Sequence, residues 1–149
     1  MRIVAQRVAR AQVSVEDQVT GRIDSGLLLF VGIHQDDTEA DSAWLADKVP
    51  KLRLFEDDTG RMARNVDEAG GGLLVISQFT LFGSIRKGTR PSFHLAAPPE
   101  RAIPLYETFL RQLRTTFAGP VEAGVFGAMM RIDALNDGPV TLILDSRER

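Results

Sequence analysis

The sequence predicts an α+β fold: a single compact domain over residues 1–149, with a mainly antiparallel, barrel-like sheet and two principal helices. Apolar runs of strand length alternate with glycine-containing turns through most of the chain. Only two stretches carry apolar residues at helical spacing. No linker, repeat or low-complexity tract interrupts the sequence, and a chain of 149 residues is the size of one domain.

The first part of the chain is typical of strands. Val13 and Val15 alternate with polar residues, a pattern of period two that indicates a half-buried strand. The pairs Thr20-Gly21 and Ser25-Gly26 predict turns on either side of a short strand. The continuous apolar run 27–33 predicts a central strand of the sheet.

The first helix is expected after residue 38. Thr38 and Asp41 have the spacing of a capping box, which marks a helix start. Pro50 marks the end of this helix. One apolar stripe follows the helical period between these limits and comprises Ala40, Trp44, Leu45 and Val49.

The middle of the chain predicts two further strands. Residues 52–55 form a short apolar stretch, followed by a polar turn at 57–60. The glycines at 70–72 lead into residues 73–76, which we expect to be a second central strand.

A second helix and two final strands complete the predicted fold. Pro104 fits best in the first turn of that helix, and residues 130–135 and 140–144 predict the last two strands. The buried face of the helix is marked by large apolar side chains at intervals of four: Leu105, Phe109, Leu113 and Phe117.

The composition excludes several classes of protein. The chain has no cysteine, which rules out disulfides and thiol chemistry and fits a reducing compartment. The first seven residues lack the apolar core of a signal peptide, and the longest apolar run is too short to cross a bilayer. We therefore expect a cytoplasmic protein without a membrane partner. The net charge of −2 gives no general sign of nucleic-acid binding, and no DNA partner is expected.

Two polar segments at the ends of apolar runs are the candidate sites: 77–81, with the sequence Ser-Gln-Phe-Thr-Leu, and 136–141, with the sequence Asn-Asp-Gly-Pro-Val-Thr. The first offers hydroxyls and an amide, the second a backbone corner at Gly138-Pro139. A structural role is open for both: Ser77 and Thr80 would then cap a strand end, and Gly138-Pro139 would be a tight turn.

No familiar set of catalytic side chains accompanies these segments. His34 and His94 are the two histidines, and nothing in the sequence ties either to Ser77 or Thr80 as a triad requires. Residues 83–89 have the wrong glycine spacing for a phosphate-binding loop. No metal-ligand spacing is present, so we expect neither a metal nor another cofactor.

Taken together, these segments resemble the D-aminoacyl-tRNA deacylases over the whole chain. The resemblance departs from the usual family sequence at 62–66 and 84–85, both outside the two longest motifs. The residues that carry the resemblance are Arg2–Val8, Leu52–Asp57, Ser77–Leu81, Lys87–Phe93, Phe126–Met130 and Asn136–Thr141.

The resemblance implies a D-aminoacyl-tRNA deacylase-like fold and an enzyme that hydrolyses the ester between a D-amino acid and the 3′ end of tRNA. It also implies a homodimer with its active sites at the subunit interface. In the family the Gly-Pro peptide is cis and enters the pocket of the partner subunit, where it would reject L-amino acids. A relative that acts on mischarged L-alanine carries Pro-Gln-Ala-Thr where this chain has residues 77–80, so the sequence favours the D-specific branch.

The resemblance also suggests roles for individual residues. The catalytic residues would be Ser77, Gln78, Phe79 and Thr80. The chiral gate and substrate pocket would comprise Gly138, Pro139, Met130 and Phe126, although adjacent methionines such as Met129 and Met130 are more often core residues. The tRNA phosphates would meet Arg86, Lys87 and Arg90, for which ordinary solvation is an equal alternative.

Two mechanisms and two other functions stay open. Backbone N–H groups near Phe79 and Thr80 would stabilise the oxyanion while the 2′-hydroxyl of the tRNA assists, or the Thr80 hydroxyl would be the nucleophile. A gate that excludes L side chains has no means of excluding glycine, so side activity on glycyl-tRNA is expected. The alternative functions are a non-catalytic dimer that binds the tRNA end and a hydrolase for another small ester.

Overall fold

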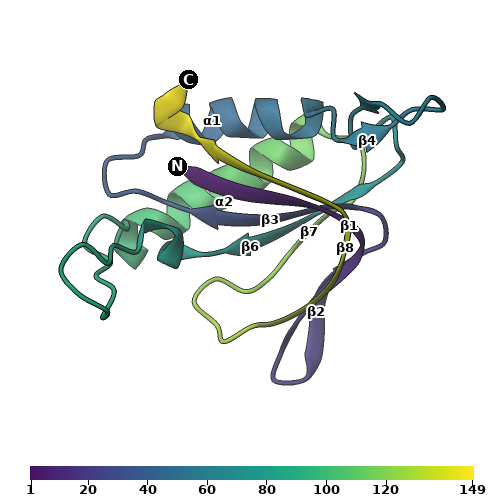
Figure 1. Cartoon of the computed structure of the whole chain (residues 1–149). Coiled ribbons are helices and arrows are strands. Elements are labelled where there is room, and N and C mark those ends of the chain that lie inside the picture. The colour runs from purple at the N-terminus through teal and green to yellow at the C-terminus, as the bar shows by residue number, and fades with distance from the viewer.

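One long strand organises the sheet. β1 (Arg2–Val15) pairs antiparallel with β3 (Gly26–Gly32) along its first half and with β2 (Gln18–Ile23) along its second half. On its other edge it pairs antiparallel with β8 (Arg131–Asp145) over nearly its full length. The computed structural model describes all of residues 1–149, and Figure 1 shows β1 and β8 running together through the molecule.

Two parallel pairings extend this sheet beyond β3. β6 (Gly72–Ser77) lies beside β3, and β7 (Val121–Ala123) lies beside β6. Each of these parallel neighbours is reached through a helix, α1 (Glu39–Lys48) in the first case and α2 (Pro99–Thr116) in the second, as parallel connections require. The α+β class with two principal helices is confirmed, and the sheet is mixed.

Five short elements complete the chain. β4 and β5 form a separate two-stranded hairpin, and three single turns of 3-10 helix follow α1, β6 and β8. Their bounds are Phe55–Glu56 for β4, Met62–Arg64 for β5, Val49–Lys51 for η1, Phe79–Phe82 for η2 and Ser146–Glu148 for η3.

The sheet has a core on each face. Both helices cover one face, with α1 at the top of Figure 1 and α2 crossing behind the strands, and the larger core lies between the helices and the sheet. Leu27 and Leu29 of β3 point into this core, whereas Leu28 points into a smaller core enclosed by the curled strands. This alternation follows from the period of two along a strand. None of the helices is long and apolar enough to cross a membrane.

The curl of the sheet explains why a predicted turn at Thr20-Gly21 is wrong. Gly21 lies inside β2 opposite Val13, and the turn is two residues of positive φ, Glu16 and Asp17. A Cβ atom at Gly21 would lie 2.9 Å from the carbonyl oxygen of Ala123 in β7. The glycine therefore marks the close approach that nearly closes the barrel.

The expected strand at 52–55 is shorter and later than predicted. Only Phe55 and Glu56 form β4, because the carbonyl oxygen of Leu54 accepts a hydrogen bond from the Arg7 side chain instead of from a neighbouring strand. The adjacent polar turn at 57–60 is confirmed, with the Asp57 carboxylate accepting hydrogen bonds from Thr59 and Arg61.

The helix predictions are confirmed in existence but not at every boundary. The Asp41 carboxylate accepts hydrogen bonds from the N–H and hydroxyl of Thr38 at the start of α1. α2 begins at Pro99, so Pro104 lies inside the helix rather than in its first turn. Pro104 is exposed, and water can therefore satisfy the carbonyl that its missing N–H leaves free.

The last two predicted strands are one continuous strand. β8 runs from Arg131 to Asp145, and the segment between its halves is an interruption in register rather than a turn. Gln6 pairs with Thr141 and Val8 with Asn136, so only Arg7 stands opposite residues 137–140. The extra residues of β8 bulge out of the ladder at that point.

Candidate active site

A pocket of about 610 Å³ opens beside the ends of β3 and β6. The floor comes from the strands and the walls from the start of α2 and the loop between β7 and β8. Thirteen of its eighteen lining residues are hydrophobic, a composition typical of sites for organic ligands. The lining includes Val31, Ile33, Ile76, Ser77, Gln78, Phe79, Phe93, Ala96, Ala97, Ala102, Phe126, Met129 and Met130.

The turn at 77–80 supplies most of the polar groups of this pocket. β6 ends at Ser77, and the N–H of Gln78 continues the ladder by donating to Val31 O at 2.7 Å. η2 then begins at Phe79. The N–H of Leu81 donates to Gln78 O, while Phe79 and Thr80 donate no backbone hydrogen bond, as expected for the first residues of a helix. The turn therefore has two free backbone donors, at Phe79 in the pocket lining and at the next residue, Thr80.

The side chains of this turn are only partly enclosed. Ser77 and Gln78 are half-buried, whereas Phe79 and Thr80 are exposed. The amide of Gln78 donates a hydrogen bond to the Thr80 hydroxyl. Ser77, Gln78 and Phe79 line the pocket and Thr80 flanks it, so the structure brings the predicted catalytic residues together.

Gly32 sets how closely the turn sits on the sheet. A Cβ atom at this position would lie 3.0 Å from Gln78 O, 3.1 Å from the Leu81 side chain and 3.2 Å from the ring of Phe82. Only a residue without a side chain lets the turn pack at this distance.

A cluster of charges holds the far side of the turn. Arg2 donates to Leu81 O at 3.0 Å and forms an ion pair with Asp145 at 2.9 Å. The guanidinium groups of Arg2 and Arg147 lie 5.0 Å and 5.4 Å from the centre of the Phe82 ring. Hydrogen bonds from Arg147, then from Arg2, hold the pKa of Asp145 well below its usual range despite burial.

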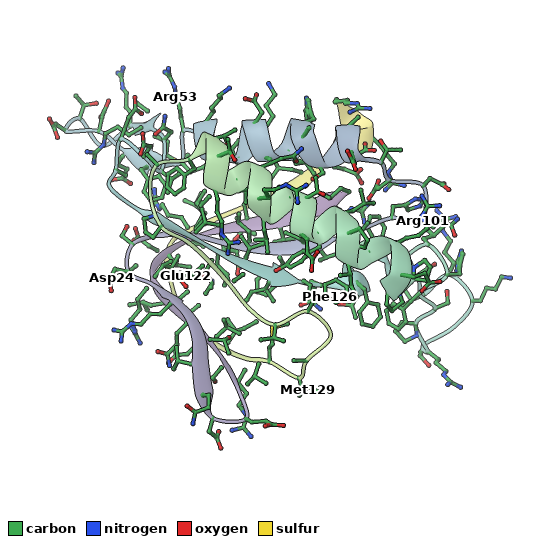
Figure 2. All side chains as sticks on the ribbon, turned by 180° about the vertical axis from the view of Figure 1, so that it is seen from behind. Asp24, Arg53, Arg101, Glu122, Phe126 and Met129 are labelled. Atoms are coloured by element: carbon green, nitrogen blue, oxygen red, sulfur yellow. The ribbon has the colours of Figure 1, made fainter.

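The opposite wall carries two of the predicted substrate residues. Phe126 and Met130 both line the pocket, and Figure 2 shows Phe126 beside α2 with Met129 farther out on the same loop. The ring of Tyr106 lies 5.5 Å from that of Phe126, and its hydroxyl donates to Val75 O. Burial raises the pKa of the Tyr106 phenol. Met129 is 90% exposed, so the interpretation of this methionine as a core residue is wrong.

Three cations lie on the loop that follows the turn. Arg86, Lys87 and Arg90 are exposed and form no ion pair. An N–H of Ser84 and an N–H of Ser92 bond to each other's carbonyl oxygens at 2.9 Å and close the loop at its base. These charges are thus available beside the mouth of the pocket.

Neither histidine contacts the hydroxyls of the turn. The ring of His34 packs edge-on against Phe82, and its Nδ1 accepts from the N–H of Asp36. His94 Nδ1 lies 3.3 Å from the Ser92 hydroxyl on the exposed loop. Acid–base chemistry at Ser77 or Thr80 has no imidazole partner in this arrangement.

Gly138 and Pro139 lie away from the pocket of their own chain. No residue of 136–141 lines the pocket. The corner lies beside Arg7, whereas the turn lies beside Arg2, and these two residues lie five positions apart on β1, a separation of roughly 17 Å. The Gly138-Pro139 peptide is cis, and Gly138 has φ of 138°, in the region that favours glycine.

Arg7 ties this corner to the rest of the molecule. Its side chain is buried and donates to Asp137 O at 3.0 Å and to Leu54 O at 2.7 Å. The Asp137 carboxylate lies 3.4 Å from the same guanidinium. This supporting role was not predicted, although a charged residue inside the apolar pattern of residues 3–8 is a sign of a buried, paired side chain.

The pocket wall formed by the start of α2 and the segment just before it was also not predicted. Ala96, Ala97 and Ala102 line the pocket with small side chains that leave its volume open. Alanines of this kind carry no local signal of function, because tertiary contacts bring them to the pocket: Ala96 and Ala97 pair with residues 33–34, and Ala102 lies on α2.

The fold and pocket define a class: a curled mixed-sheet domain that presents two backbone donors at the rim of an apolar cavity. The family model described as D-Tyr-tRNA(Tyr) deacylase matches residues 4–145. A D-aminoacyl-tRNA deacylase of Opitutus terrae is 57% identical, covering 100% of this chain and 99% of the relative. One from Thermus aquaticus is 52% identical, covering 100% of this chain and 97% of the relative.

Two solved structures share this fold. A c-Myc DNA unwinding element binding protein has a TM-score of 0.92 and 39% identity, over 97% of this chain and 98% of that one. A probable eukaryotic D-amino acid tRNA deacylase has a TM-score of 0.84 at 17% identity over 96% and 97%, a likeness of fold alone. The chain belongs to the D-Tyr-tRNA(Tyr) deacylase family and is a hydrolase, which confirms the resemblance inferred from its motifs.

Proposed function

We propose that this chain hydrolyses the ester that links a D-amino acid to the 3′ end of tRNA, releasing both in the cytoplasm. The observation that carries the proposal is the end-to-end match, at 57% identity, with a relative named D-aminoacyl-tRNA deacylase. The pocket fits such a substrate, because an apolar cavity of about 610 Å³ with free backbone donors at its rim suits an aminoacyl nucleoside.

The chemistry rests on the backbone. A water molecule attacks the ester carbonyl carbon, and the carbonyl oxygen becomes an oxyanion within reach of the N–H groups of Phe79 and Thr80. The 2′-hydroxyl of the terminal ribose assists proton transfer as the 3′-oxygen leaves. The Thr80 hydroxyl accepts from the Gln78 amide, and no base lies beside it to make it a nucleophile.

Two changes separate these mechanisms. Thr80→Ala should keep most of the activity, since the backbone donor remains, while a substrate ending in 2′-deoxyribose should be hydrolysed far more slowly. Both are measured as release of free D-tyrosine from D-tyrosyl-tRNA at saturating enzyme. Activity lost with Thr80→Ala but kept on the deoxy substrate would overturn the backbone mechanism.

Selection of D-amino acids is assigned to a homodimer. Within one chain the Gly138-Pro139 corner does not line the pocket, and Arg7, which holds the corner, lies roughly 17 Å along β1 from Arg2, which holds the turn. In a dimer the corner of one subunit enters the pocket of the other, where its carbonyls bind the amino group and its bulk excludes an L side chain. Phe126 and Met130 form the facing wall.

Mixing two inactive variants tests the cross-subunit arrangement. Ala96→Trp fills the pocket of its own chain, and Pro139→Trp enlarges the corner that enters the partner's pocket. A mixed dimer contains one site in which both parts are wild type, so mixing should restore D-tyrosyl-tRNA hydrolysis that neither variant shows alone. Sedimentation checks that each variant remains dimeric. If the mixture stays inactive although mixed dimers form, the corner does not act across the interface.

Glycyl-tRNA tests the exclusion model itself. A gate that works by excluding an L side chain cannot exclude glycine, so glycyl-tRNA should be hydrolysed while L-alanyl-tRNA is not. The comparison is made at the same high enzyme concentration. Equal inertness of both esters would contradict exclusion by bulk.

The loop cations are assigned to tRNA phosphates. Arg86→Glu, Lys87→Glu and Arg90→Glu should each weaken tRNA binding and flatten the dependence of the dissociation constant on salt. Arg53→Glu is the matched control, because Arg53 is exposed at the opposite end of the molecule from Phe126 (Figure 2). A salt slope that is unchanged in all three variants would refute the assignment.

A further inference from the structure

Two aromatic rings stand exposed at the mouth of the pocket. Phe79 is 57% exposed and Phe93 is 38% exposed, and both line the pocket rim. Their centroids are 5.1 Å apart with the planes inclined at 73°. Phenylalanine is normally buried, so an exposed pair at the edge of a cavity indicates a surface that something covers.

The pair is held by its surroundings. Phe79 begins η2, directly on the end of β6. Phe93 directly follows Ser92, whose backbone N–H and carbonyl are hydrogen-bonded to those of Ser84. The ring of Phe93 also packs closely on Gly83, where a Cβ atom would lie 3.1 Å from it. Rings fixed in this way lose little side-chain entropy when a ligand binds them.

The charge beside the pair points to the kind of ligand. Arg86, Lys87 and Arg90 lie on the loop that ends at Phe93, which protrudes at the left of Figure 1, and none is paired with a carboxylate. The whole chain has a net charge of −2, so this concentration of free cations is local. Aromatic faces next to free cations are the composition of surfaces that bind single-stranded nucleic acid.

The size of the pocket sets which nucleotide reaches the pair. About 610 Å³ holds one aminoacyl nucleoside, so the terminal residue of the tRNA fills the cavity. The nucleotide before it must lie outside, at the rim. We infer that Phe79 and Phe93 form a stacking site for the base of the penultimate nucleotide, with its phosphate next to Arg86, Lys87 and Arg90. This inference rests on the proposed function and adds a second recognised nucleotide to it.

Minimal substrates test the site. The readout is the ratio of kcat/KM for D-tyrosyl-CpA to kcat/KM for D-tyrosyl-adenosine, which isolates the contribution of the penultimate nucleotide. Phe93→Ala should lower this ratio roughly tenfold, the effect of removing one base–aromatic stack. With the wild-type enzyme, a substrate whose penultimate residue is abasic should lower the ratio as much as Phe93→Ala does. With Phe93→Ala, the abasic substrate should lower the ratio no further.

Two further variants separate stacking from a structural effect. Phe93→Tyr keeps a ring and should retain the ratio. Ile85→Ala removes another apolar side chain of the same loop, 70% exposed and outside the pocket lining, and should also retain it. The inference is overturned if Phe93→Ala leaves the ratio unchanged, whether or not kcat/KM falls equally for both substrates. It is also overturned if sedimentation shows that the variant dissociates the dimer. A wild-type enzyme that hydrolyses neither ester would instead overturn the proposed function, and the stacking site with it.

Discussion

The turn at 77–80 and the corner at Gly138-Pro139 are supported in opposite ways. The turn continues a buried strand, packs on Gly32 and is braced behind by Arg2 and Phe82. The corner is a bulge in a strand that pairs on one edge only, and one buried guanidinium reaches it.

This difference teaches where each region is vulnerable. Several contacts hold the turn, so the loss of one of them should change the position of the turn more than it changes the free energy of unfolding. At the corner a single residue donates to both Asp137 O and Leu54 O, and its loss leaves the buried Leu54 O without a donor and frees the corner from β1. Four substitutions would break or sharpen this contrast.

The largest effect is expected at Arg7. Arg7→Met keeps most of the side-chain volume but removes the donors to Leu54 O and Asp137 O, and the free energy of unfolding should fall by about 3 kcal/mol. Arg10→Met is the control, because Arg10 is mostly exposed, and it should change stability by less than about 0.5 kcal/mol. Urea unfolding measures both. Similar values for the two variants would remove the contrast between corner and turn.

The next effect tests geometry at the turn. Gly32→Ala places a Cβ atom 3.0 Å from Gln78 O, and the turn must move outward by a few tenths of an ångström. We expect kcat to fall roughly tenfold, with only about 1 kcal/mol lost from the free energy of unfolding.

A matched glycine keeps that result specific. Gly60 has φ of 79° and open space around it, so Gly60→Ala should cost about 1 kcal/mol through backbone strain with no change in kcat. Steady-state kinetics and urea unfolding separate the two quantities. An unchanged kcat in Gly32→Ala would show that the turn does not depend on its distance from the sheet.

Acid should weaken the ion pairs of Asp145 with Arg2 and Arg147, which lie behind the turn. The lowered pKa of Asp145 means that its ion pairs stabilise the fold fully above the ordinary aspartate pKa of 3.8 and lose this contribution as the pH falls below it. Asp145→Asn should lower the free energy of unfolding by about 1 kcal/mol at pH 7 and make it less dependent on pH below 4. Asp133→Asn, an exposed carboxylate, is the control. A parallel acid profile in wild type and Asp145→Asn would contradict this assignment.

The smallest effect on stability is expected at Tyr106, whose hydroxyl donates to Val75 O of β6. Tyr106→Phe removes the hydrogen bond to Val75 O and should cost about 1 kcal/mol or less while the ring still packs against Phe126. Thermal unfolding measures the cost, and D-tyrosyl-tRNA hydrolysis should be unchanged. A large loss of activity would show that the phenol, rather than the ring, positions the pocket wall.

The sequence predicted elements whose signals are local. The run at 27–33 became β3, the Thr38 and Asp41 spacing marked α1, and the helical period located α2. Elements shaped by distant contacts were not predictable in detail. Pairing with β1 keeps residues 131–145 in one strand, although the local sequence predicts two strands. The hydrogen bond from Arg7 to Leu54 O keeps Leu54 out of a strand, although the local sequence predicts a strand at 52–55.

The site followed the same rule. Ser77, Gln78 and Phe79 were found because a polar cluster ends an apolar run, and the structure places them together at the pocket. Arg7 and Ala96 depend on which segments meet in three dimensions, so their part in the site is visible only once the chain is folded. The role of Gly138-Pro139 in selecting D-amino acids requires a second subunit and remains a prediction.

β1 also has a consequence for the timing of synthesis. Its residues pair on one edge with β2 and β3, which follow directly in the sequence, and on the other edge with β8, which follows more than a hundred residues later. At about 5–20 residues per second, the stretch between the end of β1 at Val15 and the start of β8 at Arg131 takes roughly 6–23 s to make, and one edge of β1 stays unpaired for that time. The sheet can therefore close only after β8 has been made, and until then the nascent chain exposes a long strand edge that chaperones have reason to cover.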